Sequence, residues 1–187
     1  MISVYTKQTE IEVTNRRLEQ MARYNKIIQY GRQNPIWFIE NIFKVTLLDF
    51  QKYIIMGMWC AERCVLVCSR NSGKTMVGAI YMMTRGLLFP YYQINLLNIS
   101  ARQSQDTFLK MENIAKKQIA SIVGSSDVFY NEVVRSNTGG DGFLHREQSY
   151  FCQLYNGSTI TSLVGTPKTI VGFFILRALF MKIIHKS

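Results

Sequence analysis

The sequence predicts an α/β fold whose core is a parallel sheet with helices around it. Between residues 34 and 122, short apolar runs alternate with longer segments of helical period, and strands that alternate with helices at these lengths pair in parallel. A glycine-lysine-threonine motif at residues 73–75 follows the first apolar run and precedes a helical segment. Hydrophobic residues make up 48% of the 187 residues, which supports one packed domain.

Residues 1–33 are polar and predict an arm that carries a helix. Thr9 and Glu12 have capping-box spacing, and a sparse stripe of apolar residues runs through the arm. A second helix is predicted to start at Asn34-Pro35, because asparagine is a good N-cap and proline suits the first helical position. The polar character of this region argues against a secretory signal, so we expect an intracellular chain.

The elements that follow are predicted from apolar spacing and from turn residues. Pro90 ends one helix, and Asn156-Gly157 is a strong hairpin signal. Residues 123–147 are rich in Gly, Ser and Asn and predict a loop region. In chain order, the predicted elements are a helix at 47–60 with Asp49 as its N-cap, a buried strand at 63–68, a helix at 76–88, a strand at 93–99, a helix at 101–122 capped by Ser100, and a hairpin of residues 149–155 and 159–165.

A loop that binds the phosphates of ATP is predicted between the strand at 63–68 and the next helix. Such a loop can aim several backbone N–H groups at one point, and the helix N-terminus adds partial positive charge. Gly73 lets the backbone approach a phosphate, Lys74 reaches the β- and γ-phosphates, and the Thr75 hydroxyl holds Mg²⁺. The alternative is a helix N-terminus at which these residues only cap and solvate. The predicted loop residues are Ser69, Arg70, Asn71, Ser72, Gly73, Lys74 and Thr75.

Two residues of this region depart from the usual pattern. The standard motif has a glycine five residues before Gly73, where this chain has Cys68. Arg70 lies inside the loop, where its guanidinium can reach the γ-phosphate and stabilise the charge of the transition state. The alternative for Arg70 is a surface arginine that pairs with a neighbouring side chain.

The segments LDFQ, at residues 48–51, and VLVCSRNSGKT, at residues 65–75, together resemble the ATPase domain of phage terminase large subunits, the motors that package viral DNA. That family commonly replaces the early glycine and has an arginine at the position of Arg70. The family's adenine-reading glutamine falls on Gln51. The segment LYNGSTITSLVGTPKTIVG is similar to the hairpin that precedes the family's Walker B strand. The resemblance covers about residues 34–172.

The resemblance implies a P-loop fold of the ASCE type and ATP hydrolysis with Mg²⁺, with Arg70 and Lys74 as catalytic residues. It also implies double-stranded DNA as the translocated partner, a portal and a small terminase subunit as protein partners, and a ring of several copies. The compartment would be the cytoplasm of a phage-infected bacterium. The 22 Lys and Arg against 12 Asp and Glu, a formal net charge of +10, are compatible with a polyanionic partner.

The C-terminal residues depart from the family's pattern. Hydrolysis at such a site needs a strand that ends in Asp-Glu, and the family has this pair soon after the glycine that aligns with Gly172. Here no Asp or Glu follows Glu147, and the last residues read FFILRALFMKIIHKS. The earlier acids precede the hairpin, which is the wrong place in the topology; they are Asp127, Glu132, Asp141 and Glu147. We therefore expect ATP binding without effective hydrolysis, in a truncated or frame-shifted product.

The predicted organisation has three parts: a polar helical arm at 1–33, a partial P-loop ATPase domain at 34–172, and an apolar tail at 173–187. Two other functions stay open. One is a non-catalytic module that binds nucleotide or DNA. The other is a helicase-like ATPase of the ASCE group, although Arg70 favours a terminase. The sequence therefore leaves open whether the chain is an enzyme.

The four cysteines predict no metal site. Cys60, Cys64 and Cys68 recur at every fourth residue, but the chain has no Cys-x-x-Cys pair, and its two histidines are far apart in sequence. We expect these three and Cys152 to be buried, reduced thiols. No membrane partner is expected, because the most apolar stretch, 170–184, is shorter than the roughly 20 residues of a membrane span.

Overall fold

The computed structural model describes residues 18–19, 21–69, 72–98, 100–117, 127–135, 140–147 and 149–164. The chain divides into two compact units, Met1–Asn34 and Pro35–Ser187. Within the described residues, no helix has both the length and the apolar character that a bilayer crossing needs.

The first unit contains a helix whose described residues are 18–19 and 21–33. The backbone N–H and the side-chain Nδ2 of Asn34 both donate to Tyr30 O, at 2.8 and 3.3 Å. These bonds provide partners for a carbonyl oxygen in the last turn of the helix, where such groups lack partners within the helix. The predicted capping box at Thr9 and Glu12 lies outside the described residues.

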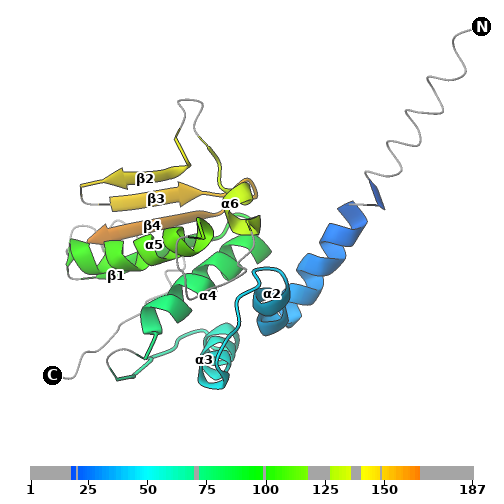
Figure 1. The fold of residues 1–187 in the computed structure, drawn as a ribbon, viewed down its shortest axis with the longest axis horizontal. Coiled ribbons are helices and arrows are strands. Elements are labelled where there is room, and N and C mark those ends of the chain that lie inside the picture. Colours follow the sequence, from blue (N-terminus) through cyan, green and yellow to red (C-terminus); the bar gives the residue numbers. More distant parts are fainter. Residues whose placement is uncertain are drawn as a thin grey trace, which may run out of the picture. The chain divides into compact units, whose positions relative to one another are not determined.

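The second unit is a mixed α/β structure, and its described strands form one sheet (Figure 1). The strand order is β1-β4-β3-β2; β1 and β4 run parallel, whereas the other two pairs are antiparallel. The predicted parallel sheet is therefore wrong for most of these pairings, because short hairpin connections join β2, β3 and β4. In chain order, the elements are α2 (Pro35–Asn41), α3 (Asp49–Cys60), α4 (Lys74–Leu88), β1 (Gln93–Asn98), α5 (Ala101–Ala115), α6 (Val128–Glu132), β2 (Phe143–Arg146), β3 (Ser149–Gln153) and β4 (Thr159–Val164).

Helices α4 and α5 pack against each other and both contact β1 and β4, so they cover the same face of the sheet (Figure 1). Ile80 of α4, Phe108 of α5 and Ile160 of β4 are buried in this layer, and burial of such side chains drives folding. Helices α2 and α3 pack on each other and on α4. Pro35 is the first residue of α2, as predicted, and α4 and β1 also match their predictions.

The predicted hairpin is confirmed, and its loop is tied to the end of α4. Strands β3 and β4 are antiparallel, and Gly157 has φ +83°, a conformation that favours glycine. Asn156 Nδ2 donates to Gly86 O at 2.7 Å and to Leu87 O at 3.2 Å. Ser158 Oγ donates to the carbonyl of Phe89, the C-cap of α4, at 2.8 Å. The hairpin loop thus satisfies carbonyl groups that the end of α4 leaves unpaired.

The predicted buried strand at 63–68 is wrong. The structure has no regular element there, and Val65 and Val67 are 70% and 68% exposed. The β-branched residues favour an extended backbone, but a strand also needs a partner, and none of the four described strands pairs with this segment. The pattern therefore identified the backbone preference and not the pairing.

Two further predictions are corrected for the residues that follow β1 in the sequence. Helix α5 starts after Ser100, as predicted, but it ends at Ala115 rather than at 122. Lys117 has φ +57°, which is not a helical conformation. The predicted loop at 123–147 contains α6 and β2, which are too short to leave a clear apolar period in the sequence.

Candidate functional site

The predicted phosphate loop leads into α4 at one end of the sheet (Figure 1). Helix α4 begins at Lys74, directly after the N-cap residue Gly73. At its other end a short turn joins Leu88 to Gln93, the first residue of β1, so α4 runs antiparallel to β1. Both elements are about 20 Å long. The loop therefore lies at the end of the sheet toward which β1 and β4 point, where open α/β sheets bind their ligands.

Lys74 is a nearly buried cation whose contacts are with backbone oxygens. The residue is 9% exposed. Its Nζ donates to Cys68 O at 2.9 Å and also to Ser69 O, and Ser72 Oγ donates to Ser69 O at 3.0 Å. Among the described residues, no carboxylate forms an ion pair with Lys74. The backbone oxygens of Cys68 and Ser69 thus hold an ammonium group whose charge no described acid neutralises.

Gly73 and Gln51 lie next to each other, although they are distant in sequence. Gly73 has φ +76°, which lies in the left-handed region that favours glycine. A Cβ atom at Gly73 would also lie only 3.3 Å from Gln51 Nε2. The structure therefore brings the glycine of the loop beside the glutamine to which the family resemblance assigns adenine recognition.

The carboxamide of Gln51 also caps its own helix. Gln51 is 7% exposed, and its Oε1 accepts the backbone N–H of Leu48 at 3.0 Å. Leu48 is the N-cap of α3, so the prediction of Asp49 as N-cap is wrong by one residue. The shift has a physical reason: Gln51 at the third helical position reaches back to the N-cap N–H, as in a capping box. This bond uses the amide oxygen and leaves Nε2 beside the loop.

The remaining predicted loop residues divide into two groups. Arg70 and Asn71 lie outside the described residues, so the predicted catalytic role of Arg70 stays a prediction. Ser69 is exposed, and Thr75 is partly exposed in the first turn of α4. The predicted Mg²⁺ contact of Thr75 also stays a prediction.

The predicted burial of the cysteines holds for Cys152 alone. Cys60 and Cys64 are exposed, and Cys68 is partly exposed, because the segment that holds two of them is not a buried strand. Burial, with a smaller contribution from Glu112, raises the pKa of Cys152 to about 12. The described residues contain no group of three His, Cys, Asp or Glu side chains that could hold a metal ion.

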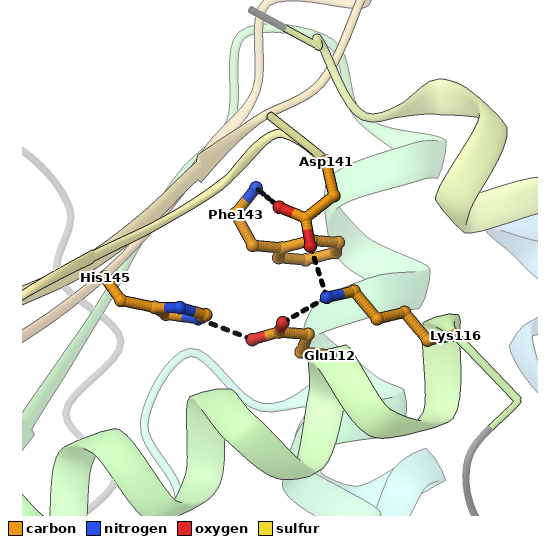
Figure 2. Close-up of polar contacts among 5 residues, drawn as sticks. All are labelled: Glu112, Lys116, Asp141, Phe143 and His145. Atoms are coloured by element: carbon orange, nitrogen blue, oxygen red, sulfur yellow. Dashed lines mark hydrogen bonds and ion pairs between the residues drawn. The ribbon is translucent and has the colours of Figure 1, made fainter. Parts of the chain in front are cut away.

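A second polar cluster, which the sequence did not reveal, joins α5 to β2 and the residues before it. Figure 2 shows Glu112 between Lys116 and His145. Glu112 Oε1 lies 2.5 Å from Lys116 Nζ, and Glu112 Oε2 lies 2.7 Å from His145 Nε2. Lys116 also pairs with Asp141, whose other oxygen accepts the Phe143 N–H at 3.1 Å. We call these four charged or titratable residues, Glu112, Lys116, Asp141 and His145, the Glu112 cluster.

The Glu112 cluster compensates the positive charge of Lys116 with two carboxylates, those of Glu112 and Asp141. Burial acts to raise the pKa of Asp141, but the Lys116 ammonium and the Phe143 N–H outweigh it and hold that pKa below its ordinary value. Burial acts to lower the pKa of Lys116, but its bonds to Asp141 and Glu112 outweigh it and raise that pKa. Side-chain exposure of Glu112 is 6%, so its partners replace most of its hydration.

The Glu112 cluster and the phosphate loop lie at opposite ends of α5. This helix follows β1, so its first residue, Ala101, is at the loop end of the sheet. Glu112 lies about 16 Å further along the helix axis. The carboxylates of the cluster are therefore too distant to serve as the acids of the phosphate loop.

Comparison of the sequence with protein-family models and with curated proteins finds no match. The assignment of the site therefore depends on its geometry and on the motifs of the sequence.

Proposed function

We propose that this chain is the ATP-binding part of a terminase-like DNA-packaging motor, with a P-loop fold of the ASCE type. The observation that carries the proposal is Lys74, a nearly buried lysine that follows a left-handed glycine at a helix N-terminus and has no carboxylate partner among the described residues. An anion at this position would meet both the ammonium group and the free N–H groups of the first turn of α4. The motif and the family resemblance favour the phosphates of ATP as that anion.

Binding would exchange contacts that the loop already makes. The Lys74 ammonium would leave the carbonyl oxygens of Cys68 and Ser69 for the β- and γ-phosphates. The missing side chain at Gly73 keeps the backbone open to a phosphate. The Thr75 hydroxyl would hold Mg²⁺, which neutralises phosphate charge when it is bound. Arg70 would contact the γ-phosphate, and Gln51 would contact adenine.

We expect negligible turnover. Hydrolysis needs a carboxylate pair beside the phosphates, and the sequence has no Asp or Glu after Glu147. Of the earlier acids, Asp141 pairs with Lys116, and Asp127 pairs with Lys117 at 2.8 Å. Both lysines follow the C-terminus of α5, the end away from the loop.

Double-stranded DNA is the proposed polymer that the motor moves. A portal, a small terminase subunit and further copies of the chain in a ring are the proposed protein partners. These partners come from the family resemblance. The formal net charge of +10 supports a nucleic acid as one of them, because phosphate contacts dominate such binding.

The test is the equilibrium binding of fluorescent ATP to the unaltered chain and to Lys74→Ala. We expect Lys74→Ala to weaken binding about 100-fold, because it removes a charge-assisted contact from a largely desolvated site. Lys110→Ala, which removes a lysine of α5 outside the loop, is the matched control and should change the affinity less than twofold. Equal affinities of Lys74→Ala and the unaltered chain would contradict the proposal. Rapid Mg²⁺-dependent release of phosphate would contradict the expected lack of turnover.

A further inference from the structure

Helices α3 and α4 meet at two places. At the first, Gln51 lies beside Gly73. At the second, Tyr81 Oη donates to Met58 O at 3.1 Å. The two contacts are about 10 Å apart along α3 and about 12 Å apart along α4, at 1.5 Å per residue. These contacts lie in the first and last turns of α3, so the contact at Tyr81 fixes the end of α3 opposite to Gln51.

The hydrogen bond from Tyr81 pairs a helix terminus that would otherwise be unsatisfied. Met58 O is among the last four carbonyl groups of α3, which lack partners within the helix. Tyr81 is 2% exposed, and its ring meets Trp59 edge-on with centroids 5.8 Å apart. Burial raises the pKa of Tyr81, so the hydroxyl group keeps the proton that it donates.

Arg85 orients this hydroxyl group. Its Nε donates to Tyr81 Oη at 3.2 Å. Its guanidinium carbon lies 4.4 Å from the centroid of the Trp59 ring and 4.8 Å from that of Phe89, so the group is held between aromatic faces. Because Arg85 occupies an acceptor position of the tyrosine oxygen, the hydroxyl proton points to Met58 O.

We propose that Tyr81 and Arg85 are positioning residues that hold Gln51 beside the phosphate loop and thereby determine which purine base the site accepts. The inference rests on the proposed function, in which a nucleotide binds at Lys74. Gln51 Nε2, which the bond to Leu48 leaves beside the loop, distinguishes adenine from guanine only when this donor meets the correct edge of the base. Helix α3 is rigid over this length, so a displacement at Met58 is carried to Gln51, where a small misplacement removes the discrimination.

The experiment measures the affinities of ATP, GTP and inorganic tripolyphosphate for the full chain and for Tyr81→Phe. This variant keeps the ring and removes the hydroxyl group. We expect the preference for ATP over GTP to fall about tenfold, which is the loss of roughly one hydrogen bond. The affinity for tripolyphosphate should stay within about twofold, because it has no base to contact Gln51. Arg85→Lys keeps the charge but lacks Nε, and it should reduce the same preference.

Two controls separate base recognition from general damage to the fold. Tyr92→Phe removes a hydroxyl group from a ring 5.7 Å from the same guanidinium and leaves the Tyr81–Met58 bond in place, so it should keep the preference. Gln51→Ala should abolish the preference, and Tyr81→Phe should then have no additional effect on it.

Four results would overturn the inference: an unchanged ATP-to-GTP ratio in both Tyr81→Phe and Arg85→Lys, an equal loss for all three ligands, a loss of the ratio in Tyr92→Phe, or no preference in the unaltered chain. Failure of the proposed function looks different, because Lys74→Ala would then bind tripolyphosphate as well as the unaltered chain does.

Discussion

Lys74 and Lys116 are both lysines of low exposure at a helix terminus, but their surroundings are opposite. Lys74 is the first residue of α4, where the helix dipole favours an anion, and its ammonium group contacts backbone oxygens. Lys116 is the C-cap of α5, where the dipole favours a cation, and its ammonium group pairs with Glu112 and Asp141. Within the described structure, carboxylates thus compensate the positive charge of Lys116, and no carboxylate compensates that of Lys74.

Lys116 is therefore placed to stabilise the fold, whereas the surroundings of Lys74 favour an added anion. A buried cation without an acid is unfavourable for stability, and the N-terminus of α4 adds to that cost at Lys74. A bound anion would relieve both effects at once. The Glu112 cluster has no such need, because its own carboxylates already supply the negative charge.

The largest effect that would test this comparison is on the free energy of unfolding. We expect Lys116→Met to lower it by about 2–3 kcal/mol, because Glu112 is left buried with His145 as its remaining partner. Lys74→Met should change it by less than about 0.5 kcal/mol or raise it, because no acid loses its partner. Urea denaturation of both variants measures the two values. Equal destabilisation by the two changes would contradict the distinction between the sites.

The next largest effect is the loss of stability in acid and in strong base. The pKa of Asp141 is below its ordinary 3.8, so its contribution is present above that pH and is lost as the pH falls through the lower folded value. The pKa of Lys116 is above 10.5, so its contribution is present below that pH and is lost as the pH rises through the higher folded value. Urea midpoints measured across pH should show both losses, with a plateau between them.

The Asp141→Asn variant tests the acid side of this profile. Its midpoint should fall less between pH 7 and pH 2 than that of the unaltered chain, whereas Lys74→Met should keep the full fall. The difference should be modest, because the Asp141 side chain is 37% exposed and is screened by water. An identical acid profile in Asp141→Asn would show that this carboxylate does not contribute.

The smallest effect is expected at another paired lysine, Lys52. It lies 2.7 Å from Glu40, and both side chains are about one-third exposed. Its bond to Glu40 raises the pKa of Lys52, yet pairs in contact with water add little to stability. We expect Glu40→Gln to leave the urea midpoint unchanged within error. A loss as large as that of Lys116→Met would mean that exposure does not explain the difference among the lysines.

The sequence predicted the parts of the fold that local signals determine. Pro90 marked the end of α4, and Asn156-Gly157 marked the hairpin, because each restricts its own backbone. It failed where a distant partner decides the outcome. The residues at 63–68 have strand character without a described strand beside them. The end of α5 was missed for another reason: Lys117 has a left-handed backbone, and lysine is not a residue type that signals such a conformation.

In the candidate site, too, the sequence predicted the local features and not the contacts between distant residues. The motif predicted Gly73, Lys74 and Thr75, because phosphate loops require these residue types at adjacent positions. Sequence spacing could not reveal that Gln51 lies at Gly73 or that Glu112 joins His145, since each contact links separate elements. The family resemblance nevertheless named Gln51, and the structure brings it to the loop.

The contact between the hairpin and the turn that joins α4 to β1 has a consequence for synthesis on the ribosome. Thr159 N donates to Tyr92 O at 3.0 Å, and Ser158 Oγ accepts the Tyr92 N–H at 3.0 Å. These bonds lie beside the pair Gln93↔Thr159, where the parallel register of β1 and β4 begins, and a one-residue slip would turn every β1 side chain to the other face. A nascent chain therefore cannot set this register until Thr159 has emerged, so β1 stays without its β4 partner while the roughly 60 residues between the two strands are synthesised.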